Sequence, residues 1–404
     1  MTTRTQSARQ FLTQAREALS SPADLPAILW PHAKMTGFET LARRDLERAF
    51  RDLDLTDSHG FEAARLASLR EAFPGAIVVD VSATTAPVHR PLDGITVEVL
   101  TAPPHRGHDG VHLADLTADD HCDLLLEAAA VPVIKITLAP DHHPGAPLIL
   151  SSTGAAANLE IHVGARSTVT LIQLSSANAP VRLGLTHVHL HEHSLVHHVS
   201  VGAHAPHTVA LEHLVAHVHH SASLHQFHSD TSGRVVRTRR DIHLLGGGAS
   251  VHAKALLTVT DALEAHHYTH VTHHVQHTQS SQLTRGLGFG QGKGSDQSVV
   301  HIKPFAAQSQ STQSSRHLLL DDRAQIHARP ILEIFNHDVK ASHGATVGSL
   351  DPQMAFYLQS RGLSPQEAQL CLQRAFWHEA LPAEPQAVLS EWFDHTLFIP
   401  LSAS

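Results

Sequence analysis

Cysteine and aromatic residues are scarce in this sequence. Its 404 residues include only two cysteines, Cys122 and Cys371, too few and too isolated for a disulfide framework or a self-contained metal cage. Aromatic residues make up 4% of the chain, which suits thin, repetitive layers of Val, Leu and Ala better than a bulky core. A chain of this length is expected to form roughly two to four domains.

Signals for membranes, secretion and nucleic acid are also lacking. No run approaches the roughly eighteen apolar residues of a membrane helix, and the first residues lack the apolar segment of a secretion signal. A net charge of −9, with only 29 Lys and Arg, argues against a general affinity for nucleic acid. We therefore expect a cytoplasmic protein without membrane or nucleic-acid partners.

Familiar catalytic motifs are missing as well. The sequence has no P-loop, no Gly-x-Gly-x-x-Gly after a strand, no His-Glu-x-x-His and no Gly-x-Ser-x-Gly. The glycine-rich run Arg285–Gly294 lacks the Ser or Thr that follows Lys in a phosphate-binding loop, so it is interpreted as a turn between strands. A carbohydrate-cleaving enzyme would need paired carboxylates, or an Asp with an Arg or Lys, in an open groove. Only Arg237, Arg239, Arg240 and Asp241 resemble such a cluster, and the favoured interpretation is that they form surface ion pairs.

Histidine is what the chain has in excess. It contains 39 histidines, 22 of them between His187 and His277. His187, His189, His191 and His193 are spaced by two, so on a strand they project from one face. The favoured interpretation is a solvent-facing row along stacked strands. Imidazole is also a common transition-metal ligand, so a histidine-rich metal-binding protein stays open as an alternative.

Short alternating segments dominate the middle of the chain. Segments such as Leu159–Val163 and Val251–Ala255 are separated by small residues, and Asn-Gly and Asp-Gly hairpin signals are absent from this region. This pattern indicates parallel strands coiled into a β-solenoid, with rungs about 4.8 Å apart. We predict an N-terminal helical region at 1–74, a small α/β segment at 75–155, a parallel β-helix at 156–345 and a C-terminal helical domain at 346–404.

The C-terminal helices carry clear start and stop signals. Asp351 and Pro352 suit a helix start and Gly362 a helix end. Ser364-Pro365-Gln366-Glu367 is a capping box that opens a second helix. Cys371 falls on the apolar stripe of that helix, which predicts a core position.

The stretch Leu332–Gly348 carries a more specific signal. Its first half alternates apolar and polar residues like a half-buried strand, and its second half holds small residues and two glycines that predict a tight turn around His343. Together with Met354–Gly362 and Gln310–Leu320, this stretch resembles the SufD family, a branch of the SufB/SufD proteins. The resemblance is specific from about Gln308 to Gly362.

The resemblance implies a fold and a role. SufD proteins are non-ATPase scaffold subunits of a bacterial iron–sulfur cluster assembly complex, built on a right-handed parallel β-helix. We therefore expect a non-catalytic scaffold that pairs with a SufB-like subunit through the β-helix, while a SufC-like ATPase docks on the C-terminal helices. A homodimer and the participation of a flavin are left open by the sequence.

The resemblance also implies a site. His343 matches the family histidine proposed to act on a transient iron–sulfur cluster at the subunit interface, with a cysteine from the SufB-like partner. Ala341 stands where many relatives carry cysteine, and Ile334 falls about where SufB-like chains carry theirs, which favours SufD over SufB. The alternative is that His343 only hydrogen-bonds the predicted turn.

Overall fold

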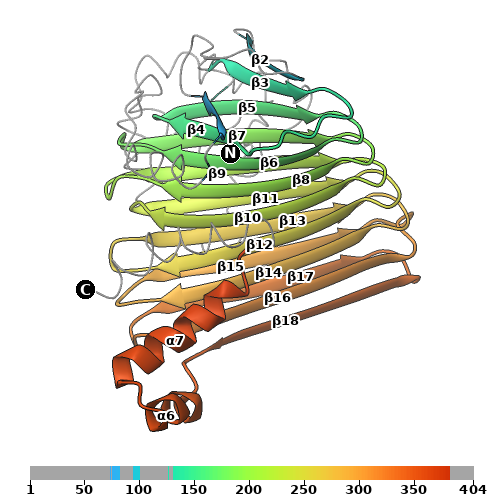
Figure 1. The fold of residues 1–404 in the computed structure, drawn as a ribbon. Helices are drawn as coiled ribbons and strands as arrows, with labels where there is room; N and C mark the ends of the chain where they lie inside the picture. Colours follow the sequence, from blue (N-terminus) through green and yellow to red (C-terminus); the bar gives the residue numbers. More distant parts are fainter. Residues whose placement is uncertain (1–72, 74, 82–93, 101–125, 127–130, 383–404) are drawn as a thin grey trace, which may run out of the picture.

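The chain winds into a stack of flattened coils whose two broad sides are β-sheets (Figure 1). The computed structural model describes residues 73, 75–81, 94–100, 126 and 131–382. The helical region predicted at 1–74 lies almost wholly outside the described residues, as does part of the predicted α/β segment at 75–155. No helix in the described part is long and apolar enough to cross a bilayer.

Each sheet contains nine strands. The first sheet runs, in spatial order, β1 (Ile77–Asp80), β4 (Leu148–Thr153), β6 (Thr168–Ser176), β8 (Leu195–Ala203), β10 (Ser223–Ser232), β12 (Ser250–Val259), β14 (Gln279–Gly288), β16 (Ser309–Leu319) and β18 (Val339–Gly348). The second runs β2 (Ile95–Leu100), β3 (Val133–Leu138), β5 (Ala156–Val163), β7 (Val181–Leu190), β9 (Val209–Val218), β11 (Val235–Leu244), β13 (Glu264–His273), β15 (Lys293–Ile302) and β17 (Gln325–Ile334).

From β4 onward, consecutive strands alternate between the sheets, so one full coil uses two strands. Neighbouring strands pair in parallel, which confirms the predicted mainly β, parallel β-helix. The antiparallel pair β2–β3 is the exception. The parallel ladders begin with β1 and β3 and run through Gly348, so they extend past both ends of the predicted 156–345 region. The division into four regions stays a prediction.

The inner faces of the two sheets enclose the core. One inward column takes one apolar residue from each successive strand of the second sheet, because side chains two apart on a strand share a face. Each such burial contributes roughly 1.5–3 kcal/mol for a large aliphatic side chain. The members of this column, in register, are Ile136, Ile161, Val188, Ala216, Ile242, Val271, Val300 and Leu332.

A repeated turn fixes the register of the coils. The turn after each strand from β3 to β15 in the second sheet holds one residue in the left-handed backbone region, where Asn, Asp, His and Gly are enriched. His193 and His277 occupy this position, and the backbone N–H of His193 donates to the carbonyl of His220 in the next coil at 2.9 Å. The full column is Asp141, Arg166, His193, Ser221, Gly248, His277 and Gln308.

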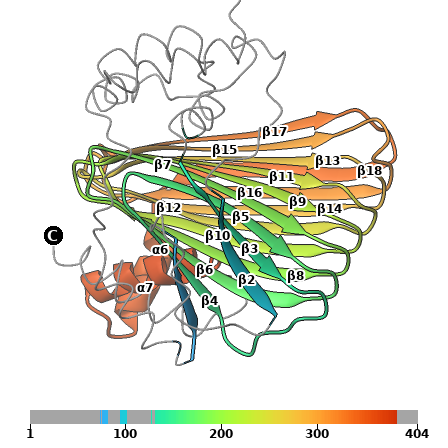
Figure 2. The ribbon, with the colours of Figure 1, turned by 90° about the horizontal axis from the view of Figure 1, so that it is seen from above.

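Two helices follow the last strand. α6 (Pro352–Ser360) and α7 (Pro365–His378) begin as predicted, with Asp351 capping the first and a complete capping box at Ser364 opening the second. Gly362 ends the first helical segment with φ +102°. Seen along the stack, α7 lies against the outer side of the first sheet, where Trp377 joins a buried cluster with Phe227 (Figure 2).

Ion pairs and hydrogen bonds also attach this tail to the solenoid. Arg285 on β14 pairs with Glu379 at 2.6 Å, and Lys254 on β12 donates to the carbonyl of Leu381 at 2.7 Å. The core position predicted for Cys371 is wrong, because its side chain is exposed. The buried face of α7 instead consists of Ala368, Gln373 and Trp377, and Cys371 lies outside it.

Candidate functional site

The last coil is an open end of the solenoid. β17 and β18 are terminal in their sheets, so within the described chain each has one edge without a strand neighbour. Large apolar side chains are exposed there: Ile334 is 39%, Phe335 59% and Val347 44% exposed. An unpaired strand edge combined with exposed apolar side chains is a surface suited to contact with another chain.

His343 lies on β18 in this open end. It pairs in register with Gln313 of β16, and its side chain is exposed. The tight turn predicted around His343 is wrong, since Val339–Gly348 is a regular strand. The turn comes earlier, where the side chain of Asn336 accepts from the N–H of Asp338 and donates to the carbonyl of Pro304. A role for His343 in stabilising a turn is thereby removed.

The position of His343 continues an inward-facing column. Ala341, two residues earlier on the same face, packs against the apolar end of the core beside Val300 and Ile302. His343 therefore stands over the space between the sheets, which we call the lumen, rather than on the outer surface. Its column, read back through the first sheet, is Gln313, Gln282, Ala253, Gln226 and His198.

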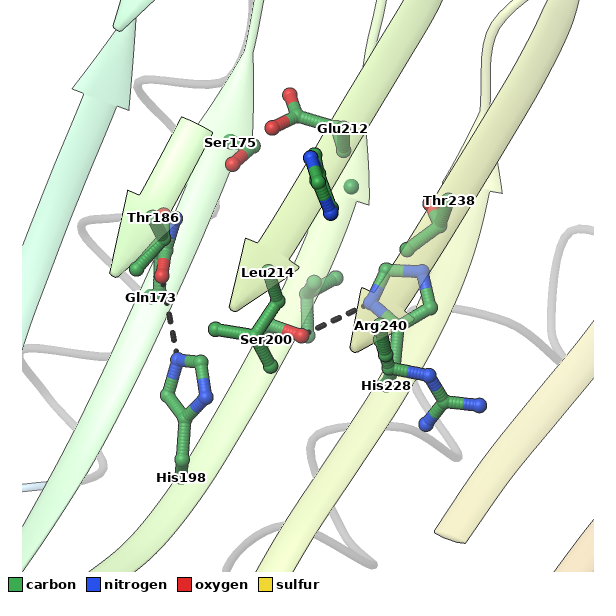
Figure 3. Close-up of a pocket in the computed structure, with 13 residues that line it drawn as sticks. Gln173, Ser175, Thr186, His198, Ser200, Glu212, Leu214, His228, Thr238 and Arg240 are labelled. Atoms are coloured by element: carbon green, nitrogen blue, oxygen red, sulfur yellow. Dashed lines mark hydrogen bonds between the residues drawn. The ribbon is translucent and has the colours of Figure 1, made fainter. Parts of the chain in front are cut away.

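The lumen itself is partly polar, which the sequence analysis did not anticipate. A cavity of about 30 Å³ lies between β8 and β10 on one side and β9 and β11 on the other (Figure 3). Ser200 contacts the Nδ1 atom of His228 at 2.8 Å, and Gln173 contacts Nε2 of His198 at 3.2 Å. Arg182 forms an ion pair at 3.0 Å with Glu212, which lines this cavity.

Two carboxylates are buried deeper in the same lumen. Asp230 on β10 is 1% exposed, and its Oδ2 atom accepts from Nε2 of His228 at 2.9 Å and Nε2 of His267 at 3.0 Å. Burial alone would raise the pKa of Asp230, but the two imidazoles hold that pKa well below its usual range. Asp296 on β15 accepts from Ser315 at 2.6 Å. The signal for this cluster was the spacing of Gln226, His228 and Asp230 by two residues.

Histidines occupy both faces of the sheets. An outer row takes one imidazole per coil: the His162 and His189 rings stack at 4.5 Å, and Nδ1 of His189 lies 3.3 Å from Nδ1 of His217. Burial, followed by the neighbouring imidazoles, lowers the pKa of His189 to about 4. The solvent-facing interpretation is wrong for the buried histidines, which are His198, His204, His213, His228, His266, His267, His273 and His317.

The cluster considered for carbohydrate cleavage forms no open groove. Arg239 and Asp241 form an ion pair, as the sequence suggested, but Arg237, Arg240 and Asp241 are buried. Arg240 faces the lumen, where it donates to Gln226 at 2.7 Å. The glycine-rich run Arg285–Gly294 comprises the end of β14, a turn and the start of β15, in agreement with its interpretation as a turn region.

Helix α6 presents a second apolar surface. It has no buried residues, and Met354, Phe356 and Tyr357 are 51%, 72% and 51% exposed. α6 contacts α7 but has no extensive packing against the described strands. The structure thus separates two exposed apolar surfaces, one on the open end of the solenoid and one on the tail.

The fold and these surfaces define a parallel β-solenoid with a partly polar lumen and an open terminal coil. A family model described as the SufBD core domain of SUF-system FeS cluster assembly matches residues 149–376, more than half of the chain. The chain therefore belongs to the SufBD family of iron–sulfur cluster assembly proteins.

Individual relatives match over shorter stretches. The chain is 35% identical over 104 residues to the iron–sulfur cluster assembly protein SufD of Escherichia coli, covering 26% of this chain and 25% of that protein. It is 42% identical over 89 residues to a SufBD family protein of Synechocystis, slr0076, covering 22% and 20%. It is 41% identical over 71 residues to SufD of Bacillus subtilis, covering 18% and 16%. The matched stretches thus span a quarter or less of these relatives.

Proposed function

We propose that this chain is a non-catalytic scaffold subunit that holds a nascent iron–sulfur cluster between its open end and a SufB-like subunit. The observation that carries the proposal is the last coil. It combines an edge of β18 that has no strand neighbour among the described residues, exposed apolar side chains and the imidazole of His343. In this proposal the cluster is cargo rather than a resident cofactor, and no flavin is needed. A second copy of the chain is the competing occupant of the same end.

A SufC-like ATPase is the second partner in this proposal. The exposed Met354, Phe356 and Tyr357 on α6 offer it an apolar docking surface. α7 attaches this surface to the solenoid through Trp377 and through the Arg285–Glu379 ion pair. Movement of an ATPase bound at α6 would thereby be transmitted to the first sheet. A cytoplasmic location remains part of the proposal.

The first prediction tests His343. An imidazole can ligate iron or orient a neighbouring thiolate, and alanine can do neither. His343→Ala is expected to leave folding and complex assembly intact, since an exposed substitution away from packing changes stability by only about 0.5 kcal/mol. Cluster yield should fall by roughly 10-fold or more, as for loss of a metal-site residue. The measurement is reconstitution with SufB-like and SufC-like partners, followed by iron, sulfide and visible absorbance.

Two variants control this experiment. His337→Ala removes another exposed imidazole from the same end and should leave cluster yield unchanged. Phe335→Asp puts a charge into the exposed apolar surface and should weaken co-purification with the SufB-like partner while the solenoid stays folded. Full cluster yield from an assembled His343→Ala complex would remove His343 from the mechanism. Undisturbed assembly of Phe335→Asp would remove this end from the interface.

A further inference from the structure

The buried group His228, Asp230 and His267 offers two imidazole nitrogens and one carboxylate oxygen within 4.8 Å of one another. Two histidines and one carboxylate form a recurrent donor set for zinc and for non-haem iron. We propose that this group, inside the lumen and separate from His343, is a binding site for one divalent first-row transition metal ion. The inference does not depend on the proposed scaffold function.

The spacing of the three donor atoms fits a metal ion. Oδ2 of Asp230 lies 2.9 Å from Nε2 of His228 and 3.0 Å from Nε2 of His267. Metal–ligand bonds of about 2.0–2.2 Å place neighbouring ligand atoms roughly 3 Å apart, so the metal can enter with small side-chain shifts. In the metal-free form two imidazole N–H groups point at one carboxylate oxygen. A cation would take the place of those two protons.

The change of tautomer that metal binding requires is supported on both imidazoles. Nδ1 of His228 lies 2.8 Å from the hydroxyl of Ser200, which accepts the N–H once Nε2 binds the metal. This is the second-shell contact that usually fixes a metal-binding imidazole. Nδ1 of His267 has no hydrogen-bond partner in the described part of the chain, so moving the proton there breaks no bond.

The carboxylate of Asp230 has one oxygen atom available for a further ligand, and neighbouring groups fix its position. Oδ1 of Asp230 is buried without a hydrogen-bond partner among the described residues, an arrangement that is costly for an ionised group. It rests against Gly202 of the neighbouring strand, where any Cβ atom would collide with it. Thr238 donates to Oδ2 at 3.2 Å and orients the group. Binding of a cation through Oδ2, with Oδ1 free to become a second ligand atom, would satisfy this carboxylate.

The charge balance of the surrounding lumen also favours a cation. The guanidinium of Arg240 is fully buried and interacts electrostatically with both Asp230 and Asp296. Further along the lumen, the charges of Arg182 and Glu212 compensate each other in an ion pair. Outside the Arg182–Glu212 pair, this part of the described lumen therefore holds two aspartate carboxyl groups and one guanidinium. The adjoining cavity of about 30 Å³ leaves room for a water molecule as a further ligand.

Because the chain is rich in histidine, the test must separate this site from surface binding. The outer group Glu160, His162 and His189 has the same donor types within 4.8 Å but is only partly buried, which makes it the matched control. The full-length chain is produced with Co²⁺ in the medium, treated with EDTA, desalted and analysed for metal. About one equivalent of Co²⁺ should remain in the wild type and in His189→Ala, and roughly a tenth or less in Asp230→Asn.

The Co²⁺ spectrum of the wild type decides the matter if Asp230→Asn does not fold. Intense visible absorption bands, typical of low-coordinate cobalt with nitrogen and oxygen ligands, are expected to survive EDTA. A wild type that retains no Co²⁺ would overturn the proposal. Equal retention by a folded Asp230→Asn variant would do the same, and loss of metal in His189→Ala alone would place the binding on the outer surface. A structural ion cluster without metal is then the remaining role of these three residues.

Discussion

Single side chains decide how tightly neighbouring coils of this solenoid can approach. Gly184 on β7 lies in register with Glu212 on β9, and an added Cβ atom would collide with the Glu212 carboxylate. That carboxylate holds the buried guanidinium of Arg182, which also donates to the carbonyl of Gly154 at 2.7 Å. A methyl group at this position therefore disturbs an ion pair as well as a close contact.

Gly184→Ala is accordingly expected to reduce the free energy of unfolding by about 1–3 kcal/mol through overpacking. The matched control is Gly344→Ala on β18, where a Cβ atom would meet nothing within 4 Å. That control should change stability by no more than about 0.5 kcal/mol. Urea unfolding followed by circular dichroism measures both values. Equal stabilities for the two variants would contradict the close packing of Gly184 against Glu212.

At the scale of single elements, α7 is joined to the solenoid through a buried apolar cluster and a few polar contacts that follow the helix. The fully buried Trp377 packs with Phe227 on the outer side of the first sheet. Removal of a buried Trp side chain typically costs about 3–5 kcal/mol. The hydrogen bonds between the strands of the coils do not involve α7. Removal of the Trp377 side chain should therefore weaken the attachment of the tail rather than the solenoid.

Trp377→Ala should therefore release the tail while the solenoid stays folded. Limited proteolysis is expected to cut the variant between β18 and α7 much faster than the wild type, with an unchanged β-sheet signal in circular dichroism. Cys371→Ser, an exposed substitution on the same helix, should behave as the wild type does. Wild-type protease resistance of Trp377→Ala would show that other contacts suffice to hold α7.

Some elements could be predicted from the sequence because residues close together in the chain determine where they begin. The side chain of Asp351 caps the start of α6, where Pro352 is the first helical residue, and the side chain of Ser364 caps the start of α7. The structure confirms both predicted helix starts. Strands were also recognisable, but which face points inward was not. β7 is buried on both faces along most of its length, so Val181, Leu183 and Thr186 give no alternation.

The coil repeat was hidden for a related reason. Leu195, Ser223, Ser250, Gln279 and Gln310 follow one another in register, yet their spacings along the chain are 28, 27, 29 and 31 residues. A period that varies this much leaves no fixed sequence repeat. The site at His343 was inferred through resemblance. The Asp230 cluster instead requires β10 and β13, which lie in opposite sheets, to face each other across the lumen, and no single stretch of sequence reveals that.

At the scale of the whole molecule, neutral histidines make stability depend on pH. Burial lowers the pKa of His198, His267 and His273 to about 4, compared with 6.5 for an unperturbed imidazole. In the half-buried His225, burial and the neighbouring His252 and His197 lower the pKa to about 4 as well. A folded-state pKa below the unfolded value means that the unfolded chain binds protons first as the pH falls.

The melting temperature should therefore be highest above pH 7 and fall steadily as the pH drops from about 6.5 towards 4. Differential scanning calorimetry across this window measures the effect. His225→Gln removes one imidazole from a row that also contains His197 and His252, so its melting temperature should fall less over the same interval. A flat or rising profile for the wild type would contradict the packing of neutral imidazoles in the coils.

The two ends of the described stack differ, and this difference bears on the proposed pairing with another chain. At the first end, the four-residue β1 pairs in parallel with β4 but β2 runs antiparallel to β3, while at the other end β17 and β18 keep the parallel pattern at full length. A chain that binds other copies at both ends can polymerise into a fibre. A chain that binds at one end only has no free binding end after its first association. Under the proposed pairing through the open end, each chain would contribute one binding end, which would cap assembly through the coils at two chains.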